Sequence, residues 1–290
     1  MKRVTLLGAA VLDHRVWVDE WPPVRRRTRA TAYVEDLGGP AAVAAATVAR
    51  LGVAATFLGL RGEDAAGARV AGFLEAYGAD TRRLTVCVAA TTAVSSIVIV
   101  PGGERFIVSY PGEGLRDDAR WVPVDALDDA DAVLVDSRLP RAGAALAAAA
   151  RARYLPVVMD LDVDAPDVWA LVGAATHVIA DEDLANRLGG AEALLARLTS
   201  GGAWGAVTLG ARGAVHADGR IPAFPVRARD TTGAGDVFHG AFVVALVEGR
   251  RAEEALIFAS AAAAVRCETG RLPERRAVEA LLAAKPRGGD

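Results

Sequence analysis

The sequence contains very little cysteine and lysine. Its two cysteines, Cys87 and Cys267, lie far apart in the 290-residue chain, so it offers neither a disulfide framework nor a zinc-binding Cys-x-x-Cys pair. Its lysines are Lys2 and Lys285, and neither follows a glycine. This excludes a phosphate-binding P-loop, which needs the order Gly-Lys-Ser/Thr, and argues against a Schiff-base lysine inside the fold.

Other catalytic and binding signatures are also absent. The histidines form no His-Glu-x-x-His pair, and no serine lies in a Gly-x-Ser-x-Gly turn, which excludes common hydrolase classes. With 33 Lys plus Arg against 36 Asp plus Glu, the net charge is −3, without the positive excess of a nucleic-acid-binding protein. No apolar run reaches the roughly 18 residues of a membrane span. The N-terminus predicts a first strand rather than a signal peptide, so we expect a cytoplasmic protein.

The chain does have a regular alternation of short apolar segments and helical patterns. Hydrophobic residues make up 52% of it, which is enough for a large core. We predict strands at 4–8, 54–60, 132–135, 157–161, 177–180 and 206–209. We predict helices at 41–51, 65–77, 141–153, 182–188, 191–199, 236–248, 252–266 and 274–284. This pattern predicts an α/β fold, one domain over 1–290 with a doubly wound, mainly parallel sheet flanked by helices.

Two segments interrupt the alternation, at about 11–36 and 84–112. They are richer in valine, threonine and aromatic residues, and the stretches 92–100 and 105–110 alternate with period two. Pro101-Gly102-Gly103 between those stretches is a hairpin turn signal. We predict that both segments form a small antiparallel β-sheet that acts as a lid on the main body.

The stretch from Asp230 to Asp236 carries the strongest chemical signal. Its sequence is Asp-Thr-Thr-Gly-Ala-Gly-Asp, and an apolar helix beginning Val-Phe-His-Gly-Ala-Phe follows. Small residues before a helix let its unpaired N-terminal amides approach a ligand, and the helix dipole favours a phosphate or developing anion there. Asp236 would lie beside that anion, where a carboxylate accepts the proton of an attacking hydroxyl. The alternative is an ordinary loop with an aspartate at the helix start.

This segment resembles the C-terminal signature of the ribokinase-like (PfkB) carbohydrate kinases. Three further stretches are similar to that family's motifs, in the same order: 38–52 (a double glycine opening a helix that ends in Arg-Leu-Gly), 59–67 (Gly-x-x-Gly-x-Asp-x-x-Gly) and 207–214 (Val-Thr-x-Gly-x-x-Gly). The resemblance covers essentially the whole chain. It implies an ATP-dependent sugar kinase that needs Mg²⁺, with a β-sheet lid that often mediates homodimerisation and no nucleic-acid or membrane partner.

The resemblance also implies roles for individual residues. Asp236 matches the family's catalytic base, and its anion hole corresponds to the backbone amides of Gly233, Ala234 and Gly235. The family's sugar-binding positions correspond to Asp13, Gly38 and Gly39. Its ATP-binding positions correspond to Thr208, Gly210 and Gly213. The alternatives are a turn residue for Asp13 and a plain hairpin turn around Thr208.

The sequence departs from the family at two places. Ribokinases have an asparagine four residues after the second glycine, where this chain has Val43, and this argues against ribose as substrate. The family's Asn-x-x-Glu motif, which organises Mg²⁺ through water, is replaced by Ala180-Asp181-Glu182-Asp183. We assign the metal to Asp183, the shortened terminal acid of this motif, and to Glu182, with Asp181 as a further acidic residue able to share the role.

Two further stretches bear on the substrate. Residues 103–111, which include Ser109, and 135–138 resemble the branch that contains sulfofructose kinases and related ketose kinases. Arg138 follows a predicted strand, at the edge where open α/β sheets bind ligands, and a guanidinium suits a sulfonate or phosphate. The alternative is a surface arginine paired with Asp136 or with the helix that follows.

Three functions therefore remain open at this point. We expect an ATP-dependent kinase of a ketose with an anionic tail, such as 6-deoxy-6-sulfofructose. The others are a nucleoside kinase of the same fold and a non-catalytic protein that binds sugar or nucleotide. An apolar, aromatic lid would favour a nucleoside, whereas the polar, arginine-bearing segments favour a sugar.

Overall fold

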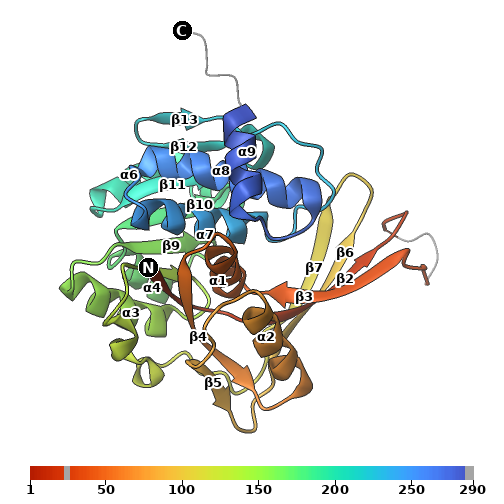
Figure 1. Ribbon diagram of the computed structural model, residues 1–290, viewed down its shortest axis with the longest axis horizontal. Helices are drawn as coiled ribbons and strands as arrows, with labels where there is room; N and C mark the ends of the chain where they lie inside the picture. Colours follow the sequence, from red (N-terminus) through yellow and green to blue (C-terminus); the bar gives the residue numbers. More distant parts are fainter. Residues whose placement is uncertain (23–26, 285–290) are drawn as a thin grey trace.

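A nine-stranded sheet forms the centre of the protein, within the residues that the computed structural model describes, 1–22 and 27–284. Its strands are β1 (Arg3–Leu7), β4 (Ala54–Gly62), β5 (Leu84–Cys87), β8 (Ala132–Asp136), β9 (Val157–Leu161), β10 (His177–Asp181), β11 (Trp204–Thr208), β12 (Ala214–His216) and β13 (Gly219–Ile221). Their order is β13-β12-β11-β10-β9-β8-β1-β4-β5 (Figure 1). Neighbours from β11 to β5 are parallel, and β12 and β13 add an antiparallel edge.

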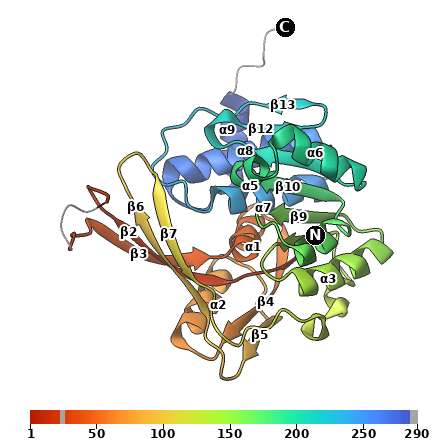
Figure 2. The same ribbon diagram turned by 180° about the vertical axis from the view of Figure 1, so that it is seen from behind.

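Helices cover both faces of this sheet (Figures 1 and 2). One layer holds α1 (Pro40–Arg50), α2 (Ala65–Ala76), α7 (Ala234–Val247), α8 (Ala252–Thr269) and α9 (Arg275–Ala284). The other holds α3 (Pro140–Ala152), α4 (Pro166–Val172), α5 (Glu182–Arg187) and α6 (Ala191–Ser200). On β8, Leu134 packs into the first layer, and Val133 and Val135 pack into the second, because successive strand side chains point to opposite faces. None of the described helices is long and apolar enough to cross a membrane.

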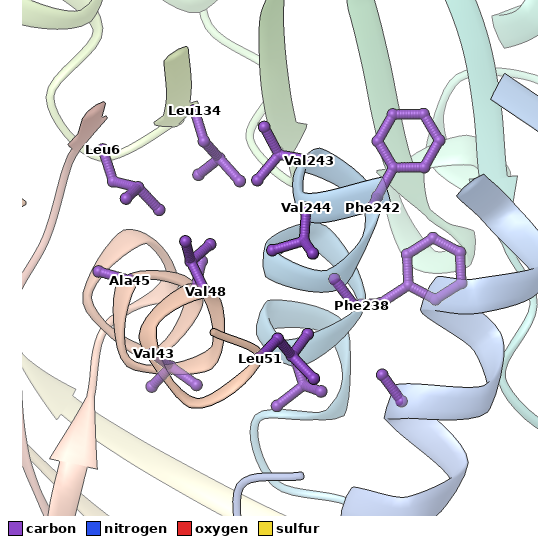
Figure 3. Close-up of a cluster of buried hydrophobic side chains, with 14 of the residues drawn as sticks. Leu6, Val43, Ala45, Val48, Leu51, Leu134, Phe238, Phe242, Val243 and Val244 are labelled. Carbon is purple, nitrogen blue, oxygen red and sulfur yellow. The ribbon is translucent and has the colours of Figure 1, made fainter. Parts of the chain in front are cut away.

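Helices α1 and α7 pack closely against each other on one face of the large sheet. Gly240 permits this approach, because a Cβ atom there would lie 2.7 Å from the carbonyl oxygen of Ala44. Figure 3 shows the surrounding cluster, which includes Leu6, Val43, Val48, Leu134, Phe242, Val243 and Val244. The contact places the first turns of both helices side by side, since Val43 lies 3.7 Å from the position that a Cβ of Gly233 would occupy.

A second sheet of four strands projects from the body (Figure 1). Its strands are β2 (Val11–Trp17), β3 (Ala32–Gly38), β6 (Ala93–Ile99) and β7 (Arg105–Tyr110), in the order β3-β2-β6-β7. We call these four strands the lid sheet. The predicted turn at 101–103 closes the β6–β7 hairpin, where the amide of Val100 donates to the carbonyl oxygen of Glu104 at 3.0 Å.

The predicted α/β class, the doubly wound parallel sheet and the smaller antiparallel sheet are confirmed. Three details differ from the prediction. Strand β5 falls inside the segment 84–112 but pairs with β4 in the large sheet, since its backbone finds a parallel partner there. The two antiparallel hairpins of the lid sheet join through a parallel pair, β2 with β6. The sequence analysis also missed α4, β12 and β13, and the short 3₁₀ turns at Ala119–Trp121, Val124–Leu127 and Gly210–Arg212.

Candidate active site

Asp136 joins three segments at the carboxyl edge of the large sheet. Its buried carboxylate accepts hydrogen bonds from the backbone amides of Ala9 at 2.8 Å, Ala41 at 3.1 Å and Arg138 at 2.9 Å. Gly8 has to lack a side chain, because a Cβ atom there would overlap this carboxylate. Burial raises the pKa of Asp136, and these three amides oppose the rise. The residue therefore fixes the edge of the site and is not itself free to bind a sugar.

The loop predicted to bind an anion leads into the first turn of α7. Gly233, the residue before the helix, has a left-handed backbone with φ 72°, which glycine adopts at little cost. The amide of Ala234 donates to the carbonyl oxygen of Thr231 at 3.2 Å, so it is partly engaged within the loop. Gly235 faces open space, because beyond its chain neighbours and the backbone of its own helix no atom lies within 4 Å of the position that a Cβ would occupy. In the described part of the chain, its amide has no acceptor, which leaves it available to an anion.

Asp236 lies in this first turn and is electrostatically tuned. Burial raises its pKa to about 7, and the nearby charges of Asp13 and Asp162 add to the rise, while Arg105 opposes it. The side chain is only partly exposed. A carboxylate with a pKa near neutrality is a stronger base than an ordinary aspartate, and this suits proton removal from a hydroxyl.

His239 contacts the same turn, and Asp160 lies beside His239. The Nδ1 atom of His239 lies 2.7 Å from the carbonyl oxygen of Gly235, and its Nε2 atom lies 3.3 Å from that of Ile179 on β10. Asp160, at the end of β9, lies 3.5 Å from Nδ1. Burial lowers the pKa of His239, and burial with the charges of Asp162 and Asp236 raises the pKa of Asp160, so both groups favour their neutral forms. The sequence analysis assigned no role to Asp160 or Asp162, although Asp160 lies near the end of the predicted strand 157–161 and Asp162 directly follows it.

On the other side of the site, Asp13 lies on β2 of the lid sheet. A Cβ atom at Gly38 would overlap its carboxylate, and Gly39 has φ 90° with the Ala9 carbonyl close by, so both predicted glycines are needed for this approach. The strand register aligns Asp13 with Ser95 and Ser95 with Ser109. The Ser95 and Ser109 hydroxyls lie 3.2 Å apart. The predicted sugar-side residues Asp13 and Ser109 thus belong to one polar row across the lid sheet.

Arg138 lies at the end of β8, as predicted, but its guanidinium forms an ion pair with Asp162 rather than with Asp136. The hydrogen bond between Arg138 and Asp136 comes from the backbone amide of Arg138, not from its guanidinium. The arginine side chain is 46% exposed, so a ligand can still reach it. An anionic ligand group has to compete with the Asp162 carboxylate for the same N–H donors of the Arg138 guanidinium.

The predicted nucleotide side lies at the end of β11. The hydroxyl of Thr208 donates to the carbonyl oxygen of Ala180 at 3.3 Å, and Gly210 faces open space. Gly213 has a packing reason to be glycine, because the carbonyl oxygen of Ile221 would overlap a Cβ there. A cavity of about 990 Å³ adjoins this turn between α5, α6 and the β12–β13 hairpin, lined in part by Leu209 and Arg212. The three predicted residues do not line that cavity.

The predicted metal residues are divided between two environments. The carboxylate of Glu182 forms an ion pair with Arg212, whereas Asp183 is exposed. Asp162 lies close enough to Asp160, Asp181 and Asp236 for its charge to raise the pKa of all three. Carboxylate oxygens are the donors that Mg²⁺ prefers, so these residues have the right chemistry for this metal, but among the described residues no three of these carboxylates place their oxygens within 4.8 Å of one another. Asp160 and Asp162 are both members of this group that the sequence motif did not indicate.

Comparison with known proteins identifies the class to which this site belongs. Residues 1–272 match the model of the pfkB family carbohydrate kinases, so the chain belongs to this family and is a phosphotransferase that acts on a sugar hydroxyl. The predicted family is thereby confirmed.

Individual relatives span the whole chain. The chain is 28% identical to the ribokinase of Bacillus subtilis (strain 168), over 97% of this chain and 100% of that protein. Its fold is similar to the crystal structure of a candidate ribokinase from Agrobacterium tumefaciens, with 33% identity, 97% and 98% coverage and a TM-score of 0.90. The structure of Arabidopsis thaliana ribokinase complexed with ribose and ATP is 25% identical over 98% of this chain and 100% of that one, with a TM-score of 0.84.

Proposed function

We propose that the protein transfers the γ-phosphate of ATP to a hydroxyl of a small sugar, with Asp236 as the general base. The observation that carries this proposal is the placement of Asp236, tuned to a pKa of about 7, beside the open amide of Gly235. A base and an anion-binding group side by side are what attack of a hydroxyl on a phosphoryl group needs.

Each part of the site has a proposed task in that reaction. Asp13, Gly38 and Gly39 hold the sugar hydroxyls, and Asp236 takes the proton of the hydroxyl that attacks. The first-turn amides of α7 stabilise the negative charge that develops on the transferred phosphoryl group. The proposed nucleotide contacts are Thr208, Gly210 and Gly213. Mg²⁺ would neutralise phosphate charge and would be held from Asp162 and Asp160, with Asp183 and Glu182 as the sequence-based alternative.

For the acceptor we propose a ketose with an anionic tail, bound at Arg138 with Ser109 nearby. Two relatives support the two halves of this proposal. The rice protein named Fructokinase-1 is 28% identical to this chain, and an ATP-dependent ribose-1-phosphate kinase of Halopiger xanaduensis is 27% identical. The first name is that of a ketose kinase, and the second is that of a kinase whose acceptor already carries an anion. The polar row that includes Asp13 and Ser109 offers little apolar surface for a nucleoside base.

The lid sheet is proposed to close over the sugar and to join two copies of the chain, which we propose to be one domain acting in the cytoplasm. Its outer face exposes Tyr33, Phe106, Val108 and Tyr110, with Val108 73% accessible. Phe106, Val108 and Tyr110 alternate along the edge strand β7, and the register places Tyr33, on the opposite edge strand β3, in line with Phe106 through the partly exposed Val16 and Val98. A contiguous exposed apolar patch is typical of a protein interface, so a homodimer through this face is the proposed assembly.

An ADP-release screen tests the proposed reaction. The acceptors are 6-deoxy-6-sulfofructose, fructose, fructose 6-phosphate, ribose and adenosine, each with Mg²⁺ and with EDTA. We expect Mg²⁺-dependent turnover that is highest with an anionic ketose. Highest turnover with adenosine would refute the sugar assignment, and ADP release that needs no acceptor would refute acceptor phosphorylation.

A further inference from the structure

Arg15 is a buried arginine that the mechanism above does not use. It lies on β2, two residues after Asp13 and on the same face of the lid sheet, and is 4% exposed. Its guanidinium meets three carboxylates from three segments: Asp13 at 3.6 Å, Asp36 of β3 at 3.3 Å and Asp230 of the loop before α7 at 3.5 Å. Burying this many charges together costs free energy unless each charge is paired. The cluster is therefore a buried ionic network and not an exposed surface ion pair.

The cluster continues from Asp230 into the anion-binding loop. Arg266 of α8, 2% exposed, lies 3.3 Å from the same Asp230 oxygen that Arg15 approaches. The other carboxylate oxygen of Asp230 accepts the amide of Thr232 at 2.8 Å, directly before Gly233. A chain of charged contacts therefore connects Asp13, in the sugar site, to the first turn of α7, in the phosphoryl site.

Arg15 does not itself have room to bind a sugar. The cavity beside it measures about 10 Å³ and is enclosed by Asp36, Val43, Tyr77 and Gly233 among others. That volume admits a single water molecule and no sugar. Any effect of Arg15 on the acceptor therefore has to act through Asp13.

We propose that Arg15 is a positioning residue for the acceptor: its guanidinium holds the Asp13 carboxylate in its sugar-binding orientation and fixes that carboxylate's distance to the phosphoryl site through Asp230. This inference rests on the proposed role of Asp13 in sugar binding. It deepens that role, because it explains how Asp13, on the projecting lid sheet, keeps a fixed position relative to the loop before α7. That loop lies more than 200 positions later in the chain.

The charges around Asp13 give the proposal a pH signature. Burial raises the pKa of Asp13 to about 6, Arg15 is the main group that opposes the rise, Asp36 adds to it, and His14 opposes it weakly. Asp236 of α7 also faces Asp13, while Asp230 and Arg266 face Arg15 from the other side. Loss of Arg15 removes the main opposing charge, so the pKa of Asp13 has to rise further. As the pH is lowered, the ionised form of Asp13, which binds sugar hydroxyls, is then lost at a higher pH than in the wild type.

The test compares Arg15→Gln and Arg15→Lys with wild type, using fructose and 6-deoxy-6-sulfofructose as acceptors and a pH range of 5 to 9. We expect Arg15→Gln to raise the KM for the sugar about 10- to 150-fold, the range for hydrogen bonds to a charged group. The KM for ATP should change less than threefold. The pH below which sugar binding weakens should move upward from about 6 in Arg15→Gln. Arg15→Lys keeps the charge, so that pH should stay in place while the KM recovers only in part.

The matched control is Arg69→Gln. Arg69 pairs with Glu35, the neighbour of Asp36 on β3, but it is exposed and lies away from Asp13, so both KM values and the pH profile should stay unchanged. If Arg15→Gln raises both KM values equally with an unshifted pH profile, Arg15 is only structural and the inference is wrong. If Arg15→Gln does not fold, Arg15→Lys decides the question. A pH profile of Arg15→Lys that is displaced from the wild-type profile by one unit or more would overturn the proposal.

Asp13→Asn separates this inference from the function beneath it. A wild-type KM for the sugar in Asp13→Asn would refute the proposed sugar site itself. If Asp13→Asn abolishes sugar binding while Arg15→Gln binds sugar normally, the sugar site stands and the role of Arg15 is refuted.

Discussion

Replacing Asp236 by asparagine should destroy activity and stabilise the fold at the same time. Asparagine has nearly the same shape and cannot accept the proton of a hydroxyl. We expect kcat to fall by about 10²- to 10⁴-fold, the usual contribution of a positioned general base. The affinity for ATP should change little, because the carboxylate is proposed to face the acceptor.

The stabilisation follows from the raised pKa. The pKa of Asp236 rises from 3.8 to about 7 in the folded chain, a shift of about 3 units, or about 4 kcal/mol between the two protonation states. Folding therefore favours the protonated form, so the carboxyl destabilises the wild type increasingly as pH rises from about 4 to 7, and by a constant amount above that. Asparagine mimics the protonated form and escapes this cost.

The assay is thermal unfolding of wild type and Asp236→Asn at pH 8 and at pH 4, together with turnover at pH 8. The variant should melt higher at pH 8, and the difference should nearly vanish at pH 4. Wild-type kcat should itself fall as pH drops through about 7, when Asp236 becomes protonated. Near-normal turnover in the variant would refute the base assignment. Equal melting temperatures at pH 8 would refute the electrostatic reasoning.

Three further changes test other parts of the site. Gly235→Val should fold, because space is open at that position, yet lose activity by obstructing the phosphoryl group; an unfolded variant would show that the residue is structural. Arg138→Ala should raise the KM for sulfofructose about 10- to 150-fold and leave that for fructose nearly unchanged, with Arg138→Lys rescuing in part. Equal losses on both sugars would mean that Arg138 only neutralises Asp162. Val108→Asp should convert the proposed dimer to a monomer in light scattering, and a wild type that is already monomeric would refute the interface.

The polar row of the lid sheet shows the limit of motif-based prediction. Asp13 and Ser109 were predicted separately, from different motifs. Only strand pairing aligns them, through Ser95, and the parallel join of β2 with β6 that produces this register has no local sequence signal. Strand β5 makes the same point, because its composition suggested the lid while its backbone partner lies in the large sheet.

The sequence by itself determined the alternation of strands and helices, and therefore the doubly wound sheet, because hydrophobic periodicity and glycine stops are local properties. It also determined the loop before α7, since a run of small residues before an apolar helix leaves amides exposed wherever it folds. Only the tertiary structure decided that Asp160, Asp162 and Arg15 belong to the site. Their neighbours come from strands and loops far apart in the chain, and the pKa of Asp236 depends on charges that meet only when those strand ends converge.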